Sequence, residues 1–147
     1  MKIIAENRKA YFNYFILEEI EAGISLVGSE VKSVRAGKVN ISDSHADEKG
    51  GAIYLLNANI NEYHGANRFN HEPRRPRKLL LHKKEINKLI GKVQTKGLSL
   101  VPLSLYFNEK NKVKIKLALV KGKKLHDKRA SIKEKDERRA EARQSEY

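Results

Sequence analysis

The chain has 147 residues, enough for one folded domain with a core of its own. Lys and Arg number 31 against 18 Asp and Glu, and the net charge of +13 favours a polyanionic partner such as RNA or DNA. The absence of cysteine excludes disulfides, thiolate zinc sites and a cysteine nucleophile. No stretch reaches the roughly 18 apolar residues of a membrane span, and the first residues contain no apolar signal segment, so we expect a soluble cytoplasmic protein with no membrane partner.

The first half of the chain predicts a strand, a short helix and a hairpin. The aromatic run AYFNYFIL, residues 10–17, is typical of a strand. The segment EVKSVRA predicts a short helix, with Ser29 as its N-cap and Gly37 as its stop. Strand-like runs on both sides of the pair Gly50 and Gly51 predict a β-hairpin.

The second half predicts a long loop, a helix and a strand. Residues 61–77 lack periodicity and contain two prolines, so we expect a loop. Residues 79–97 carry apolar side chains at helical spacing, and Gly97 is placed to end the helix. The strand-like run 98–107 contains Pro102, which cannot donate to a sheet and therefore indicates an edge or a bulge.

The last strand-like run alternates apolar residues with Lys112, Lys114 and Lys116. This pattern predicts a strand with an apolar inner face and a cationic outer face. The lysines either meet phosphates or only protect an edge strand from aggregation. About six short strands and two helices in residues 1–120 predict a mainly β fold, a small closed antiparallel barrel.

Three further cationic stretches are candidates for RNA contact. EPRRPRK places several cations beside prolines that limit the freedom of the loop, and VKGKK surrounds a glycine that allows close approach of a ligand. ENRKAYF places Arg8 and Lys9 next to Tyr11 and Phe12. These two aromatic side chains either stack on unpaired bases or belong to the core.

Residues 121–147 form a charged tail with ten Lys or Arg and six Asp or Glu. Its few large apolar residues cannot bury enough surface to offset the entropy of ordering it, so we expect it to be intrinsically disordered in the free protein. Its many Lys, Glu, Arg and Ala residues are good helix formers, and the tail could become helical along RNA. The other interpretation is a solvated tail that only aids solubility.

No motif in the sequence points to catalysis. The histidines show no compact metal spacing, and there is neither a Gly-rich phosphate loop nor a nucleophile elbow. Asp43, His45 and Asp47 alternate on one predicted strand face, where they either hold the metal of a nuclease or are solvated strand residues. The second interpretation is favoured, so we expect a protein that is not an enzyme and has no metal or cofactor.

Several segments together resemble one family. They include EVKSVRAGKVNISDS, RKLLLHKKEI, LVPLSLYF and KGKKLHDKR, and they occur in order from Asn7 to about Glu134. This combination resembles small protein B (SmpB), the family that binds tmRNA, also called SsrA RNA, in bacterial trans-translation. The resemblance implies an OB-like six-stranded antiparallel barrel in residues 1–120 and a flexible tail in residues 121–147.

The resemblance also implies a function. Such a protein is an RNA-binding adaptor for the tRNA-like domain of tmRNA, which it delivers to stalled ribosomes so that incomplete proteins are tagged for degradation. The implied partners are the decoding centre and ribosomal RNA of the small subunit, with elongation factor Tu in the delivery complex, and the implied state is a monomer. A general binder of single-stranded RNA or DNA is the alternative.

The predicted site residues fall into two groups. Glu21, Leu80 and Lys114 are similar to family positions that matter for tmRNA binding. The full predicted RNA-binding set is Asn7, Arg8, Lys9, Glu21, Arg35, Lys38, Lys78, Leu80, Lys114, Lys121, Lys123 and Lys124. In the tail, His126, Asp127, Lys128 and Arg129 are implied to act at the decoding centre and in the mRNA channel.

Overall fold

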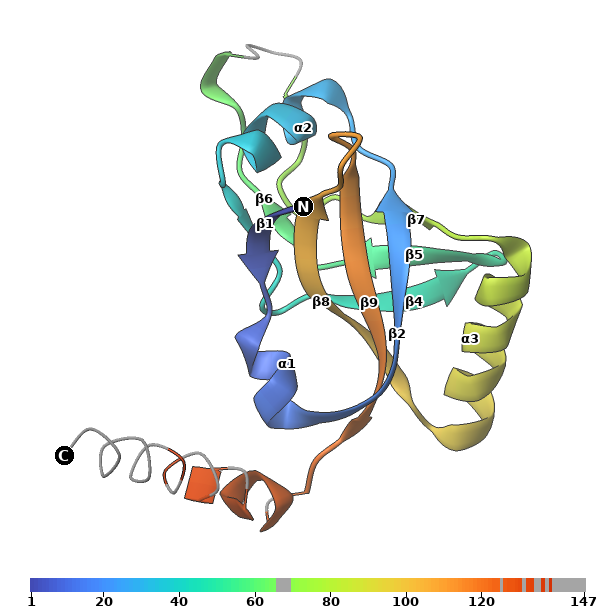
Figure 1. Cartoon of the computed structure of the whole chain (residues 1–147). Helices are drawn as coiled ribbons and strands as arrows, with labels where there is room; N and C mark the ends of the chain where they lie inside the picture. Colours follow the sequence, from blue (N-terminus) through green and yellow to red (C-terminus); the bar gives the residue numbers. More distant parts are fainter. Residues whose placement is uncertain (66–69, 125, 131, 134–135, 137, 139–147) are drawn as a thin grey trace, which may run out of the picture.

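The computed structural model describes residues 1–65, 70–124, 126–130, 132–133, 136 and 138. Within them the chain forms a mainly β domain with three helices outside the tail (Figure 1). The strands are β1 (Lys2–Glu6), β2 (Tyr14–Ile24), β3 (Val39–Asn40), β4 (His45–Lys49), β5 (Ala52–Leu56), β6 (Asn59–Ile60), β7 (Arg77–Leu80), β8 (Ser99–Phe107) and β9 (Val113–Gly122). The helices are α1 (Arg8–Asn13), α2 (Gly28–Arg35) and α3 (Lys83–Lys96).

Six of the described strands close into the predicted antiparallel barrel. The order of pairing is β8–β4–β5–β7–β2–β9, and β9 pairs back onto β8, so the sheet returns to its first strand. The seventh strand of the sheet, β1, pairs with the part of β8 near Phe107, beyond the point where β4 pairs at Leu100. A separate two-stranded sheet joins β3 and β6.

Apolar residues and lysines alternate along β9, with the apolar side chains inside the barrel and the lysines outside. Ile115, Leu117 and Leu119 lie in the main core, while Lys114 and Lys116 are on the outer face. The alternation ends where α1 covers the outer face, because Ala118 and Val120 pack there against Ala10 and their side chains are also buried.

The prediction of a strand over residues 10–17 is wrong for its first half. Residues up to Asn13 belong to α1, and only from Tyr14 does the chain enter β2. The aromatic residues of this run have high strand propensity, but tertiary packing decides the outcome. Burial of Ala10 in a small cluster against β8 and β9 holds the segment as one and a half turns of helix.

The beginning of α2 differs from the prediction as well. Val27, and not Ser29, is the N-cap, and the Glu30 carboxylate accepts a hydrogen bond from the Val27 N–H at 2.9 Å. The stops are as predicted: Gly37 and Gly97 have φ of 74° and 62°, in the left-handed region that glycine enters without strain.

The hairpin and the proline bulge are confirmed. β4 and β5 pair antiparallel on the two sides of Gly50 and Gly51, and both glycines have positive φ. The register of β8 against β9 shifts between Pro102 and Ser104, where the proline cannot donate.

The tail begins where β9 ends. β9 reaches Gly122, two residues beyond the predicted boundary at 120, and the described residues 126–130 are helical. The rest of the predicted tail lies largely outside the described residues, so its disorder in the free protein stays a prediction. No helix in the described part of the chain is long and apolar enough to cross a membrane.

Candidate RNA-binding surface

One row of residues runs across five strands on the outside of the barrel, and we call it the transverse row. Strand pairing places Ile3 beside Tyr106, Tyr106 beside Lys114, Lys114 beside Gly23, and Gly23 beside Leu80. Leu80 and Lys114, both predicted site residues, are therefore separated by one residue that has no side chain. Leu80 is 53% exposed although it is a large apolar residue.

The third residue of the predicted trio lies in the next row. Glu21 pairs across the strands with Lys116, and its carboxylate Oε2 accepts a hydrogen bond from the Tyr106 hydroxyl at 2.5 Å. Burial, the hydrogen bond and the negative charge of Glu21 raise the pKa of Tyr106, so the hydroxyl keeps its proton and donates. Although Lys116 is the register partner of Glu21, its side chain forms an ion pair with Glu19 instead, at 3.6 Å.

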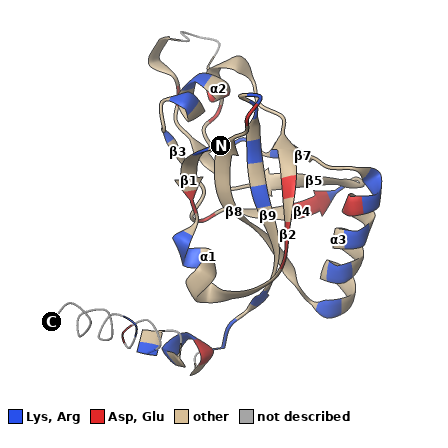
Figure 2. Cartoon of the chain, viewed as in Figure 1, with Lys and Arg blue, Asp and Glu red and all other residues tan. Residues whose placement is uncertain are grey.

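Two hollows flank Lys114 on this face. The lysine groove, of about 480 Å³, is lined by Met1, Glu21, Tyr106, Asn108, Glu109, Lys110, Lys112 and Lys114. A smaller hollow of about 340 Å³ includes Gly23, Leu80, Lys112 and Lys114. Figure 2 shows the blue bands of β9 beside the acidic segment of β2. This face offers cations, an apolar side chain and a carboxylate within one small area.

The other predicted cations of the body are exposed around the barrel. Lys78 is on β7, Arg35 ends α2 with its guanidinium 5.9 Å from the centre of the Phe107 ring, and Lys38 follows that helix. Arg8 and Lys9 on α1 form surface ion pairs with Glu6 and Asp43, at 3.8 and 3.5 Å. Pairs so exposed contribute little to stability, so an RNA phosphate can compete for them.

Asn7 has a place in the fold rather than on the surface. Its side chain is only 3% exposed, and its Nδ2 donates to the Pro102 carbonyl oxygen at 3.0 Å. Its backbone N–H donates to the carbonyl of Leu103 at 2.8 Å. These bonds fix α1 on β8, so Asn7 positions the neighbouring Arg8 and Lys9.

The two interpretations of Tyr11 and Phe12 are separated by the structure. Their side chains are 55% and 40% exposed, so neither is a core residue. They lie near the beginning of the tail, because Lys123 donates its backbone N–H to the Asn13 carbonyl and its Nζ lies 5.2 Å from the centre of the Phe15 ring. Aromatic rings next to cations form a surface on which bases can stack.

The tail residues that the structure describes show how its helix starts. Asp127 Oδ2 accepts from the Lys124 N–H at 3.2 Å, and the Lys128 N–H donates to the Lys124 carbonyl at 3.1 Å. The Asp127 carboxylate thus caps the backbone N–H of Lys124 at the start of this helical segment. His126 lies 3.2 Å from the same carboxylate, and Lys121 and Arg129 are exposed.

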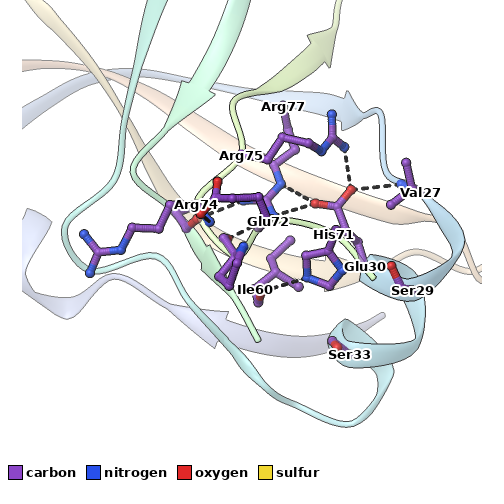
Figure 3. A network of polar contacts seen from close by, with 12 residues as sticks. Val27, Ser29, Glu30, Ser33, Ile60, His71, Glu72, Arg74, Arg75 and Arg77 are labelled. Carbon is purple, nitrogen blue, oxygen red and sulfur yellow. Dashed lines mark hydrogen bonds and ion pairs between the residues drawn. The ribbon is translucent and has the colours of Figure 1, made fainter. Parts of the chain in front are cut away.

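A buried ionic network was not predicted from the sequence (Figure 3). Glu30 and Arg77 are both fully buried and form an ion pair at 2.5 Å, and Arg75 reaches the other oxygen of Glu30 at 2.5 Å. Burial alone would raise the pKa of Glu30, but hydrogen bonds from Arg75, the Val27 N–H and Arg77 lower it below its usual value. Arg75 and Arg77 belong to the EPRRPRK stretch, which was predicted to contact RNA. In the structure they instead hold α2 against the barrel through Glu30.

His71 completes the attachment of the long loop. Its Nδ1 lies 2.8 Å from the Ser29 hydroxyl and its Nε2 2.8 Å from the Ile60 carbonyl oxygen. Among the described arginines of the loop only Arg74 is exposed, and its guanidinium donates to the Asn57 side chain at 2.9 Å. The only signal of this network in the sequence is a glutamate inside a helix and a cluster of arginines, which does not specify their pairing.

Asp43, His45 and Asp47, the residues of the nuclease alternative, all line one hollow of about 590 Å³, but this does not make them a metal site. Among the described residues there is no group of three or more His, Cys, Asp or Glu that could hold a metal ion. Asp43 pairs with Lys9, while His45 and Asp47 are exposed on β4.

A closed antiparallel barrel with a cationic outer face and a basic C-terminal segment defines a protein of the nucleic-acid-binding barrel class. The family model described as SmpB protein matches residues 4–147. The chain belongs to the SmpB family, which confirms the resemblance found in the sequence.

Individual relatives support the same assignment. The SsrA-binding protein of Rhodopseudomonas palustris (strain BisB5) is 63% identical over 143 residues, which cover 97% of this chain and 91% of that protein. The SsrA-binding protein of Rickettsia bellii (strain OSU 85-389) is 64% identical over 142 residues, covering 97% and 94%. A chain of the solved structure "tmRNA-SmpB: a journey to the center of the bacterial ribosome" is 50% identical, with a TM-score of 0.69, and the match covers 86% of this chain and 92% of that chain.

Proposed function

We propose that this protein is an RNA-binding adaptor that binds the tRNA-like domain of tmRNA and delivers it to stalled ribosomes for trans-translation. Membership of the SmpB family and the similarity to SsrA-binding proteins over nearly the whole chain support this function. The similar chain in a tmRNA–SmpB structure of the bacterial ribosome supports the ribosomal setting. The protein acts by binding and not as an enzyme.

The transverse row is the observation that carries the proposal for the body. It places Lys114 and Leu80 side by side, with Glu21 one row away, although the three are far apart in the sequence. Lysines on a strand can meet successive phosphates, while an exposed leucine packs on a sugar or base. Arg35, Lys38 and Lys78 are further exposed cations of the body, and Arg8 and Lys9 are exposed on α1, which lies toward the tail end of β9.

The tail acts at the other end of the barrel. The row crosses β9 at Lys114, whereas the tail leaves the same strand after Gly122, about 25 Å away by the rise of a strand (Figure 1). Residues 1–120 thus hold tmRNA, and residues 121–147 enter the empty mRNA channel. There the segment from His126 to Arg129 meets ribosomal RNA, while Lys121, Lys123 and Lys124 at the base of the tail belong to the RNA-binding set of the body. Elongation factor Tu joins the delivery complex, and the protein works as a cytoplasmic monomer.

Competition binding tests the proposal. A labelled tRNA-like fragment of tmRNA is bound at physiological salt, with excess ordinary tRNA or poly(U) as the competitor. Retained selective binding is the expected result. Binding that either competitor removes equally would leave only a general single-strand binder and would overturn the proposed function.

Truncation after Lys124 separates the two ends. The shortened protein keeps the outer face of the barrel, so we expect it to bind the tRNA-like fragment as the full chain does. Without the tail it fails to support tagging on stalled ribosomes in a reconstituted translation assay. Loss of fragment binding as well would place the tail in the tmRNA-binding surface and contradict this division.

A further inference from the structure

Two carboxylates line the lysine groove, those of Glu21 and Glu109, and in the described part of the chain neither forms an ion pair with a lysine of the groove. Lys110, Lys112 and Lys114 line this groove, and among the described residues none of them forms an ion pair. Glu21 lines the same groove, is exposed, and is engaged by the Tyr106 hydroxyl instead.

Tyr106 holds the Glu21 carboxylate in place. Tyr106 belongs to the row of Lys114, and Glu21 belongs to the row of Lys116, so the hydrogen bond between them passes across β9. The tyrosine is only 4% exposed, which leaves its ring little freedom to move. The bond fixes Oε2, and in the described part of the chain Oε1 has no hydrogen-bond partner.

The fixed carboxylate has a definite chemical preference. A carboxylate oxygen only accepts hydrogen bonds, so it favours a base edge that presents an amino group and opposes one that presents a carbonyl. The cytosine N4 amino group is such a donor, and uracil has an O4 acceptor at the same position. Lysines around the carboxylate supply the cations that the flanking phosphates need.

We infer that the lysine groove is a base-reading site, in which Glu21 accepts a hydrogen bond from the exocyclic amino group of an unpaired nucleobase and Tyr106 is its positioning residue. This inference rests on the proposed function in one respect, namely that the partner is RNA. It assigns to the groove a preference for amino-bearing bases over uracil, in addition to the electrostatic attraction of the lysines.

Cytidine and uridine oligonucleotides of equal length test this preference in the full chain. Both are pyrimidines with equal charge, so they differ mainly in the group at position 4. We expect the wild-type protein to bind oligocytidine about fivefold or more tightly than oligouridine at physiological salt. Equal affinities would overturn the base-reading site.

Two variants locate the preference in the groove. Tyr106→Phe removes one hydroxyl and no charge, so we expect the cytidine-to-uridine ratio to fall toward one while the salt dependence of binding is unchanged. Glu21→Gln introduces an amide N–H that can donate to uracil O4, so we expect its ratio to shift toward uridine. Because Glu21 is exposed, the second variant folds even where the first is destabilised.

The outcomes distinguish this inference from the proposed function. An unchanged ratio in both variants would refute the role of Glu21 and Tyr106, even if the tRNA-like fragment were still bound selectively. A ratio that changes as expected, with no selective binding of that fragment, would support the base-reading site and refute the tmRNA adaptor.

Discussion

Leu80 and Lys114 lie on the two sides of Gly23, so that an apolar side chain and a cation are neighbours on the outer face of the barrel. A Cβ built on Gly23 would lie 3.1 Å from the Leu80 Cβ, closer than ordinary van der Waals contact. The glycine therefore leaves the space that Leu80 now occupies. The φ angle of Gly23 lies outside the left-handed region, so the backbone itself would accept alanine without strain.

Gly23→Ala should impair RNA binding more than stability. Leu80 is exposed enough to move aside by a few tenths of an ångström, and the strand gains from losing a flexible glycine. We expect the free energy of unfolding to change by less than about 1 kcal/mol, while affinity for the tRNA-like fragment falls severalfold. Calorimetry and fragment titration measure the two effects, and unchanged affinity would show that the position of Leu80 is irrelevant to RNA.

Gly91→Ala is the matched control and a prediction in itself. Gly91 lies inside α3, and a Cβ added to it would meet no atom within 4 Å beyond the backbone of its own helix. Alanine in a helix interior is favoured over glycine by roughly 1 kcal/mol. We expect higher stability in urea unfolding with fragment affinity unchanged, and reduced stability would contradict the open environment of Gly91.

Lys114→Gln tests phosphate contact by its dependence on salt. If Lys114 meets one phosphate, its neutralisation lowers the slope of log affinity against log salt concentration by about one. Lys96→Gln makes the same charge change at the exposed last residue of α3, away from the transverse row, and should leave the slope nearly unchanged. Equal slopes for the two variants would assign Lys114 a structural role.

Glu30→Gln should strongly destabilise the fold, because it leaves the fully buried Arg77 without its partner. Breaking a buried ion pair by removing one partner costs about 3–5 kcal/mol. The pKa of Glu30 is lowered in the folded protein, so its contribution is present at neutral pH and is lost as pH falls below the ordinary value of 4.5 through the folded pKa. Urea unfolding at neutral and acid pH should show a difference between wild type and variant that shrinks in acid.

Glu19→Gln provides the comparison on the surface. Glu19 and its partner Lys116 are both 44% exposed, and solvent screens the pair. We expect little change in the urea midpoint. A loss as large as that of Glu30→Gln would mean that burial does not account for the effect.

Patterns of neighbouring residues in the sequence predicted much of the fold, because the spacing of apolar residues depends on which side of a helix or strand is buried. The alternation of β9, the Gly50 and Gly51 hairpin and the bulge at Pro102 each depend on neighbours close in sequence. The prediction for residues 10–17 was wrong in its first half because burial of Ala10 against distant strands outweighed aromatic strand propensity.

The arrangement of the site could be predicted only in part. Lys114 was found from its alternating pattern, but nothing local specifies that Gly23 separates it from Leu80, since this depends on the register of three strands. Likewise, the pairing of Glu30 with Arg77 joins a helix to a strand through the folded core, and the bond from Tyr106 to Glu21 passes across a third strand.

Asp127→Ala tests the start of the tail helix. The carboxylate caps the Lys124 N–H, and loss of such a cap costs a helix about 1 kcal/mol. A short helix is marginal by itself, so this loss should move the Cα chemical shifts of residues 126–130 toward random-coil values in NMR of the full chain. We expect tagging on stalled ribosomes to fall while affinity for the tRNA-like fragment is retained.

Charge-matched variants separate capping from charge. Asp136→Ala removes the same charge from an exposed tail residue beyond this first turn. It should change the chemical shifts of residues 126–130 and the tagging activity less than Asp127→Ala does. Asp127→Glu keeps a carboxylate that can reach back to the Lys124 N–H, and should restore part of both signals. If Asp127→Ala and Asp136→Ala were equally impaired, the tail would depend on its net charge, and the cap seen at Lys124 would have no part in its function.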